Sequence, residues 1–229
     1  MTPPVKTPPA AARMAVRTAV ILLIFVVVFT SLLAAAFLWT QPAIEAAAAA
    51  EKMKLIAEVL PREVYDNDLL QDRLPLAPSA ALGLDEASTA YRARKAGKLS
   101  ALVFEAVAPD GYSGKIRLLL AVGADGTLLG VRVTQHKETP GLGDYIDPRK
   151  DKNKEHPWIS QFDGLSLANV GDREWRVRKD NGRFDSVAGA TVTPRAVIKA
   201  VHKALRYVAE NRGQLFADAN SMPNPGGTR

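Results

Sequence analysis

The chain contains no cysteine among its 229 residues. It therefore forms no disulfide, holds no iron–sulfur cluster through thiolates and offers no thiol nucleophile. It has three histidines, His136, His156 and His202, and none of them is paired with a second one at the spacing of a metal site. The sequence thus predicts no metal site. Any redox chemistry has to come from a bound organic cofactor or from another subunit.

Positive charge exceeds negative charge, with a formal net charge of +6 and a pI near 9.6. The basic residues are scattered singly, and the sequence contains neither zinc-finger spacing nor an aromatic RNA-binding pattern. We therefore expect no nucleic-acid partner. The length suits one domain with its own core plus additional segments rather than two domains.

The longest apolar run extends from Ala19 to Trp39 and is interrupted only by Thr30 and Ser31. At about 1.5 Å per residue it spans about 30 Å, the thickness of the hydrocarbon core of a bilayer. A cleaved signal peptide is the alternative, but its apolar region is usually about 7 to 15 residues long, shorter than this run. We predict a single uncleaved transmembrane helix over residues 19–40.

The segment before the apolar run is basic. Residues 1–18 are rich in proline and alanine, carry Lys6, Arg13 and Arg17, and contain no acidic residue. We expect them to form a disordered leader on the cytoplasmic side, because positive charge flanking a span is retained there. Everything after Thr40 then lies across the membrane.

Residues 41–97 are expected to be a juxtamembrane helix followed by a linker. The helix is predicted from Pro42 to Leu60, where an alanine block precedes an apolar stripe and Pro61. The linker is punctuated by prolines, and a short helix is expected in it from Asp85 to Ala96.

From residue 98 the pattern becomes typical of strands. Strands are predicted for Leu99–Val107, Lys115–Val122 and Leu128–Gln135, with a turn around Gly111 to Gly114 and a hairpin turn at Asp125-Gly126. We therefore predict an α+β fold in which residues 98–214 form a domain built on an antiparallel sheet. Residues 215–229 are expected to be a disordered tail.

The region after the third strand is less regular. Asp147 to His156 is dense in charge and is expected to be a solvated loop. Trp158, Ile159 and Phe162 are expected to bury against the sheet, and Arg173 to Val177 is predicted to be a short strand.

A C-terminal helix is predicted to begin with Thr193 as N-cap and Pro194 at the first helical position. Its apolar stripe comprises Val197, Ala200, Val201, Ala204, Leu205 and Val208, and Arg212-Gly213 supplies the stop. The unpaired amides of Arg195, Ala196 and Val197, with the charge of Arg195, would favour a phosphate. Most Ser/Thr-Pro helix starts, however, are structural caps without a ligand.

Two motifs argue for a ligand at this helix. D-S-V-A-G-A-T-V-T, from Asp185 to Thr193, resembles the flavinylation signature of FMN-binding domains, in which the last threonine carries FMN through a phosphoester bond. Ala188 stands where that family usually has Ser or Thr. H-K-E-T-P-G-L-G, from His136 to Gly143, resembles the second signature of the family, a loop that lies against the cofactor. Such domains occur in the G subunit of Rnf-type electron-transport complexes and in the C subunit of sodium-pumping NADH:quinone oxidoreductases.

The resemblance implies a set of FMN-binding residues and no catalytic acid or base. Thr193 would carry the covalent FMN, the phosphate turn would comprise Gly189, Ala190 and Thr191, and the ring-side loop would comprise Glu138, Thr139, Gly141, Leu142 and Gly143. The chain would then be an electron-relay subunit of a membrane-bound, ion-translocating oxidoreductase complex. Its main domain would lie on the periplasmic side of a bacterial inner membrane, with the bilayer, other subunits and a flavin transferase as partners.

Several functions remain open at this point. The G subunit is preferred because the region between the anchor and the flavin domain is short, and the C subunit is the near alternative. A membrane-tethered binding or scaffold module, with Thr193 only capping a helix, is an alternative of another class. A reductase acting alone is the third. No turnover is expected from the isolated chain, because it has no nucleotide-binding fingerprint and no hydride-donor site.

Overall fold

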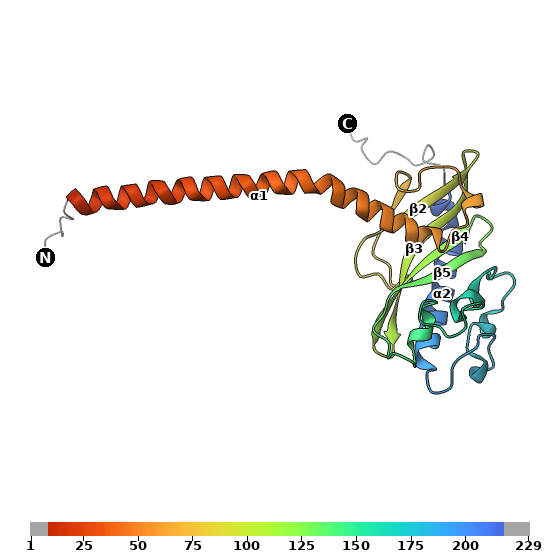
Figure 1. The fold of residues 1–229 in the computed structure, drawn as a ribbon. Coiled ribbons are helices and arrows are strands. Elements are labelled where there is room, and N and C mark those ends of the chain that lie inside the picture. The colour runs from red at the N-terminus through yellow and green to blue at the C-terminus, as the bar shows by residue number, and fades with distance from the viewer. Residues whose placement is uncertain (1–8, 218–229) are drawn as a thin grey trace, which may run out of the picture. The chain divides into compact units, whose positions relative to one another are not determined.

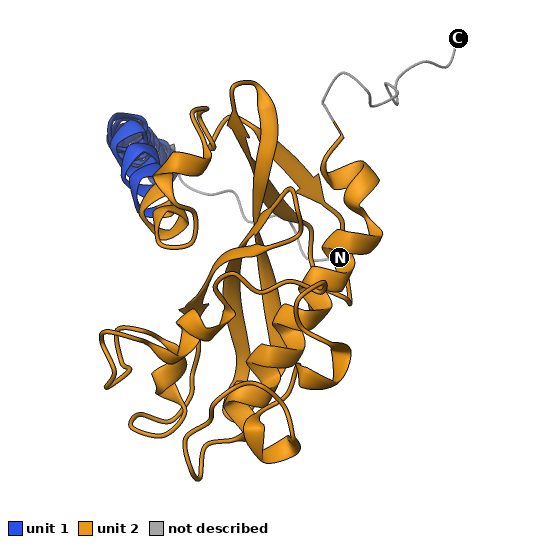
Figure 2. Cartoon of the chain, turned by 90° about the vertical axis from the view of Figure 1, so that its right-hand side faces the viewer, with its two compact units in different colours: residues 1–51 blue, residues 52–229 orange. Residues whose placement is uncertain are grey.

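The computed structural model describes residues 9–217. The chain divides into two compact units, residues 1–51 and residues 52–229, which are coloured separately in Figure 2. The first unit holds most of helix α1 (Pro9–Ala57), which is drawn in red and orange in Figure 1. This helix is long and apolar enough to cross a membrane, with a mean hydropathy of 3.0 over its most apolar stretch. The predicted span lies inside it.

Helix α1 is longer at both ends than the predicted span. Residues 9–18, which we expected to be disordered, are helical, and the rest of the predicted leader lies outside the described residues. The prediction of a separate helix starting at Pro42 is wrong, because α1 continues through that proline. Proline removes one backbone hydrogen bond from a helix, and here the remaining turns carry the helix across it. The hydroxyl of Thr40 donates back to the carbonyl of Ala36 at 2.9 Å.

The second unit is built on a five-stranded antiparallel sheet with the order β1-β2-β3-β4-β5 (Figure 1). The strands are β1 (Arg73–Leu76), β2 (Ser88–Lys95), β3 (Lys98–Gly111), β4 (Gly114–Gly123) and β5 (Leu128–Gln135). The three predicted strands correspond to β3, β4 and β5, and both predicted hairpin turns are present. With α1 and the C-terminal helix α2 (Val192–Glu210), this confirms the predicted α+β fold.

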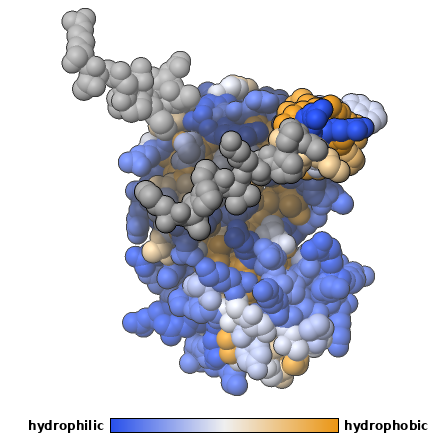
Figure 3. Space-filling model, turned by 90° about the vertical axis from the view of Figure 1, so that its left-hand side faces the viewer, coloured by the Kyte–Doolittle hydropathy of each residue, from blue (hydrophilic) through white to orange (hydrophobic). Residues whose placement is uncertain are grey.

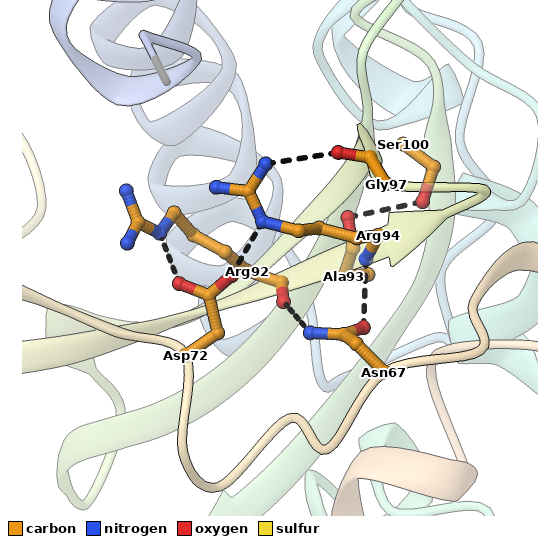
Figure 4. A network of polar contacts seen from close by, with 7 residues as sticks. All are labelled: Asn67, Asp72, Arg92, Ala93, Arg94, Gly97 and Ser100. Atoms are coloured by element: carbon orange, nitrogen blue, oxygen red, sulfur yellow. Dashed lines mark hydrogen bonds and ion pairs between the residues drawn. The ribbon is translucent and has the colours of Figure 1, made fainter. Parts of the chain in front are cut away.

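Strands β1 and β2 lie in the segment that we expected to be a linker. The short helix predicted from Asp85 to Ala96 is wrong, because most of that segment is β2. Asp72 binds two arginines of this strand, Arg92 and Arg94, each at 2.6 Å, and Figure 4 shows its carboxylate between them. Asn67 also bonds to the backbone of the strand. Long-range contacts therefore decide the conformation of β2.

The same contacts shift the ionisation of Asp72. Partial burial would raise the pKa of its carboxyl, but the hydrogen bonds from Arg94 and Arg92 outweigh burial and hold the pKa below its usual value. The carboxylate form is thus the one that stabilises this edge of the sheet.

Side chains alternate along the strands and form a core on each face of the sheet. On one face Leu102, Phe104, Leu118 and Leu120 pack with the apolar side of α2. On the other face Val103, Leu119 and Ala121 pack with Ile56, Val59 and Leu60, at and just after the end of α1, and with Tyr65 and Leu69. The segment around residue 60 is therefore part of the folded domain.

Residues 136–191, all of which the structure describes, form loops and short 3-10 turns between β5 and α2. These are η2 (Asp144–Ile146), η3 (Trp158–Phe162), η4 (Asp172–Glu174) and η5 (Arg178–Asp180). Trp158, Ile159 and Phe162 are buried, as predicted. The strand predicted from Arg173 to Val177 is wrong, since only an isolated bridge joins Val177 to Phe184.

The chain ends differently from the predicted tail. A short helix, α3 (Arg212–Leu215), follows α2, and Leu215 is buried in the core beside it. The disorder predicted beyond residue 217 falls outside the described residues.

Candidate functional site

Helix α2 begins two residues earlier than predicted. Its first residue is Val192 and its N-cap is Thr191, so Thr193 lies within the first turn rather than at the cap. The amide of Arg195 donates to the carbonyl of Thr191 at 3.3 Å and is therefore not free for a ligand. The unpaired amides of a helix belong to its first residues, here up to Thr193. The predicted phosphate site on the amides of residues 195–197 is therefore wrong.

The hydroxyl of Thr193 contacts Glu138 in the loop after β5. Thr193 is 2% exposed and its Oγ1 donates a hydrogen bond to Oε2 of Glu138, which is itself 4% exposed. The other carboxylate oxygen, Oε1, accepts the amide of Ser113 at 3.0 Å. The two sequence motifs and the β3–β4 hairpin therefore meet at a single buried carboxylate.

Two glycines make room for this contact. A Cβ on Gly143 would lie 2.7 Å from Oγ1 of Thr193 and 2.9 Å from Oε2 of Glu138. A Cβ on Gly111 would lie 2.9 Å from the other carboxylate oxygen. Carbon atoms do not approach oxygens this closely without displacement, so glycine is required at both positions for the carboxylate to stay where it is.

A cavity of about 270 Å³ opens beside Thr193. Its lining consists of Tyr112, Glu138, Thr139, Leu142, Gly143, Gly189, Ala190, Val192 and Thr193. Seven of the nine residues predicted to bind the cofactor thus line one cavity. Gly141 and Thr191 are not part of the lining. Gly141 adopts a positive φ of 76° and donates its amide to Asp144, and Thr191 caps α2.

Sequence reasoning missed Tyr112 and Val192. Among the described residues outside α1, the exposed large apolar side chains are Tyr112, Leu142, Val187 and Val192. Three of them line the cavity, and the fourth belongs to the turn before α2. Figure 3 shows a pale and orange area near the bottom of the view, next to surface that is mostly blue. Tyr112 could have been found from the sequence, because an aromatic residue in a predicted hairpin turn is often exposed for a ligand.

The turn from Asp185 to Ala190 is held from behind by aromatic side chains. The hydroxyl of Tyr145 donates to the carbonyl of Ala190 at 3.3 Å and accepts the amide of Val187 at 3.4 Å. The indole of Trp158 donates to the carbonyl of Asp185 at 2.6 Å. Burial raises the pKa of Tyr145 to about 12, so its hydroxyl keeps its proton for the bond to Ala190. Gly189 adopts φ 85°, which supplies the reversal of the chain.

The charge-dense loop contributes to this support, contrary to the expectation of a fully solvated loop. Asp147 and Asp151 in this loop are buried. Asp151 accepts the amide of Trp158 at 2.6 Å and so fixes the start of η3. The basic residues of the loop, such as Lys150 and Lys152, face solvent.

The cavity lining contains no cation, and its one charged member is Glu138. Arg195, which we expected to attract a phosphate, forms a two-pronged ion pair with Asp180, both bonds at 2.7 Å, and lines a different cavity. The hydrogen bond from Arg195 lowers the pKa of Asp180, so the pair stays charged at neutral pH. The predicted role of Arg195 at the phosphate is therefore not supported.

The N-terminus of α2 attracts an anion and the Glu138 carboxylate repels one, and these two effects differ in size. A helix N-terminus favours an anion by about 0.3 to 2 kcal/mol. Two unit charges about 4 Å apart repel each other by about 4 kcal/mol at the effective dielectric near a protein surface. One carboxylate at such a distance therefore outweighs one helix N-terminus, and Glu138 lines the cavity together with Thr193.

The cavity and its lining suit part of a flavin. Binding pockets for ligands of this size range from about 300 to 1,000 Å³, so a cavity of about 270 Å³ accommodates part of the molecule and leaves the rest at the apolar rim. Thr193 is part of the lining, and Leu142 and Val192 add exposed apolar side chains to it. Among residues 9–217, no cluster of three His, Asp or Glu side chains is placed to hold a metal ion.

Comparisons with known proteins agree with this geometry. Residues 111–206 match the FMN-binding domain family, and residues 6–59 match the family described as the RnfG N-terminal region. The G subunit of the ion-translocating oxidoreductase complex of Pseudomonas aeruginosa (strain UCBPP-PA14) is 48% identical over 91% of this chain and 95% of that protein. The corresponding protein of Shewanella baltica (strain OS223) is 43% identical over 82% of this chain and 86% of that protein.

A solved structure is also similar. The crystal structure of Shewanella oneidensis NqrC covers 63% of this chain and 75% of that chain, with 24% identity and a TM-score of 0.40.

The curated relatives match most of the chain, and they are G subunits, the alternative that we preferred because the region between the anchor and the flavin domain is short. The match to the RnfG N-terminal region covers residues 6–59 and so includes α1, the helix of the described residues that is long and apolar enough to cross a membrane. The chain therefore belongs to the family of G subunits of ion-translocating oxidoreductase complexes, single-pass membrane proteins with an FMN-binding domain.

Proposed function

We propose that this chain is the electron-relay subunit of a membrane-bound oxidoreductase complex and carries FMN in a phosphoester bond to Thr193. The observation that carries the proposal is the convergence of two motifs, distant in the sequence, on one cavity with Thr193 in its lining. The FMN-binding domain match over residues 111–206 supports the choice of ligand.

Each part of the cavity has a role towards the bound flavin. FMN, when bound, supplies the ability to accept and release electrons. Leu142, Val192 and Tyr112 offer an apolar rim on which a flat ring packs. Tyr145 and Trp158 hold the turn before α2 in shape, so that the attachment residue is presented from a rigid support.

A covalent bond explains how the cofactor is retained. The N-terminus of α2 contributes about 0.3 to 2 kcal/mol towards an anion, whereas nanomolar retention requires about 12 kcal/mol. No cation in the cavity lining adds to this attraction. An ester bond to Thr193 removes the dependence on affinity.

The location completes the proposal. Arg13 and Arg17 precede the apolar part of α1, and positive charge on that side of a span favours a cytoplasmic N-terminus. The FMN-binding domain then lies on the periplasmic side, where lost FMN would not be replaced. A flavin transferase that attaches the cofactor and the other subunits of the complex are the expected partners.

The test replaces single hydroxyl groups. We expect the wild-type chain, expressed with its transferase, to fluoresce under ultraviolet light after denaturing electrophoresis, and Thr193→Ala to lose this fluorescence completely. Thr191→Ala is the matched control, because Thr191 lies two residues away, outside the cavity lining, and should retain the signal. A fluorescent Thr193→Ala band would disprove attachment at this residue, and a dark Thr191→Ala band would implicate the turn rather than one hydroxyl.

A further inference from the structure

The cavity beside Thr193 is unusual for a site that is meant to receive a phosphate. Phosphate sites in proteins gather arginine, lysine or several free amides. Here the one charged lining residue is an acid, Glu138, and the nearest arginine along α2, Arg195, is committed to Asp180. Lys137, the neighbour of Glu138 in the chain, is exposed and does not line the cavity.

We propose that Glu138 makes the unloaded cavity selective for an uncharged flavin and excludes a flavin with a free phosphate. The inference rests on the proposed function and deepens it. The ligand class of the empty site is then a neutral isoalloxazine with a polyol tail, such as riboflavin, rather than FMN. The phosphate reaches this site only as part of the ester on Thr193.

The carboxylate cannot easily move out of the way. Its two oxygens are bonded to Ser113 and Thr193, and it is 4% exposed. The backbone at Gly111 and Gly143 approaches so closely that even a Cβ would touch the carboxylate. A free phosphate placed beside Thr193 would therefore meet a negative charge that is fixed in position.

Attachment changes the charge of the phosphate. A phosphate monoester carries about 1.5 to 2 negative charges near pH 7, whereas the diester on Thr193 carries one. The repulsion from Glu138 is correspondingly smaller in the loaded protein. The cavity is thus matched to the product of attachment and not to free FMN, which prevents free FMN from occupying the site before the transferase acts.

The experiment measures equilibrium binding to the unloaded full-length chain, expressed without the transferase and purified in detergent. Riboflavin and FMN are titrated separately, and binding is followed by the quenching of flavin and tryptophan fluorescence. We expect riboflavin to bind at least about tenfold more tightly than FMN, which corresponds to about 1.4 kcal/mol. Equal affinities, tighter binding of FMN, or no binding of riboflavin would overturn the proposal, and this comparison needs no variant.

The Glu138→Gln variant assigns the selectivity to one side chain. It removes the charge and keeps the shape, so FMN should bind about tenfold more tightly than to the wild type, while riboflavin changes by less than about threefold. Asp125→Asn is the matched control: it also removes one negative charge, but from the turn at the other end of β4, about 30 Å away by strand length. Its FMN affinity should equal that of the wild type. An equal gain in Asp125→Asn would mean that net charge, not Glu138, sets the selectivity.

These outcomes are separate from those of the proposed function. If intact mass finds flavin on Thr193 of the native chain while the unloaded chain prefers FMN, only the selectivity of Glu138 is disproved. If Thr193 is never modified but riboflavin is preferred, the covalent attachment fails and the cavity selectivity stands.

Discussion

The two faces of the sheet are both buried, but they are covered by very different parts of the chain. One face is covered by α2, whose apolar stripe is evident in the sequence, and the cavity lies where this helix begins. The other is covered by residues 53–70, at and beyond the end of α1, which looked like a stalk and a linker. Gly130 in β5 allows the backbone of Val59 to approach, since a Cβ there would lie 2.5 Å from the Val59 carbonyl oxygen.

The end of helix α1 therefore belongs to the core of the domain. Ile56 and Leu60 are each 1% exposed, as deeply buried as residues of α2. A truncated chain that begins at the first predicted strand would therefore expose one face of the sheet. The cavity lies on the α2 side of the sheet, and the core on the other side stabilises the sheet that positions the cavity residues.

The largest effect on stability is expected from truncating a core leucine on the face that looked like a stalk. Leu60→Ala should lower the free energy of unfolding by about 2 to 5 kcal/mol, because it leaves a cavity in a packed core. Leu205→Ala, on the α2 face and 2% exposed, is the matched control and should cost a similar amount. Denaturant unfolding of the full chain in detergent, followed by tryptophan fluorescence, measures both. A cost below about 1 kcal/mol for Leu60→Ala would show that the segment is only a stalk.

A smaller effect is expected at the edge formed by β1 and β2. Asp72→Asn should lower the free energy of unfolding by about 2 kcal/mol, since it weakens hydrogen bonds to two arginines, Arg92 and Arg94. The pKa of Asp72 is lowered in the folded protein, so its contribution is present above about pH 4 and disappears as the pH falls through the folded pKa.

The pH dependence distinguishes this ion pair from simple packing. The melting temperature of the wild type should fall more steeply below about pH 4 than that of Asp72→Asn, and the two should converge in acid. Parallel curves across this range would mean that Asp72 does not act through its charge.

The smallest effect on stability, with a large effect on the site, is expected from Gly143→Ala. The new Cβ meets Oγ1 of Thr193 and Oε2 of Glu138, and displacing the Thr193 hydroxyl breaks its hydrogen bond to the carboxylate, so the cost in unfolding free energy should be about 0.5 to 1.5 kcal/mol. Flavin fluorescence of the denatured band should nevertheless decrease strongly, because the attachment hydroxyl is displaced.

Gly130→Ala is the matched control, with a larger effect on stability and none on flavin attachment. Its Cβ meets the backbone of Val59, so the free energy of unfolding should fall by about 1 to 3 kcal/mol. Retained flavin in Gly143→Ala would show that the close packing at Thr193 is not needed for attachment.

Local patterns were sufficient to predict the part of the fold that contains the site. The hairpins β3–β4 and β4–β5 have strong turn residues, and α2 has a clear apolar stripe. The two motifs placed seven of the nine predicted residues around one cavity, because each motif is local and the sheet brings them together. The local sequence did not distinguish which threonine caps α2, since Thr191 and Thr193 are both good cap residues and Pro194 is tolerated in the first turn after either of them.

The errors share one physical cause, which is that distant partners decided the local structure. Strand β2 contains Arg92, Ala93, Arg94 and Lys95, residues that favour a helix, and it is a strand because Asp72 and β3 bind it. Arg195 was predicted to attract a phosphate, but it forms an ion pair with Asp180, which lies in another segment and so was not evident from the local sequence. The charge of a site depends on such partners, and sequence spacing does not reveal them.

Peptide mass mapping of the chain, isolated from native membranes in which the flavin transferase is active, shows directly whether Thr193 carries the flavin. We predict that the peptide containing Asp185 to Thr193 carries the added mass of FMN less one water, and that fragmentation assigns it to Thr193. An unmodified Thr193, or a flavin found on another residue, would disprove covalent attachment at Thr193.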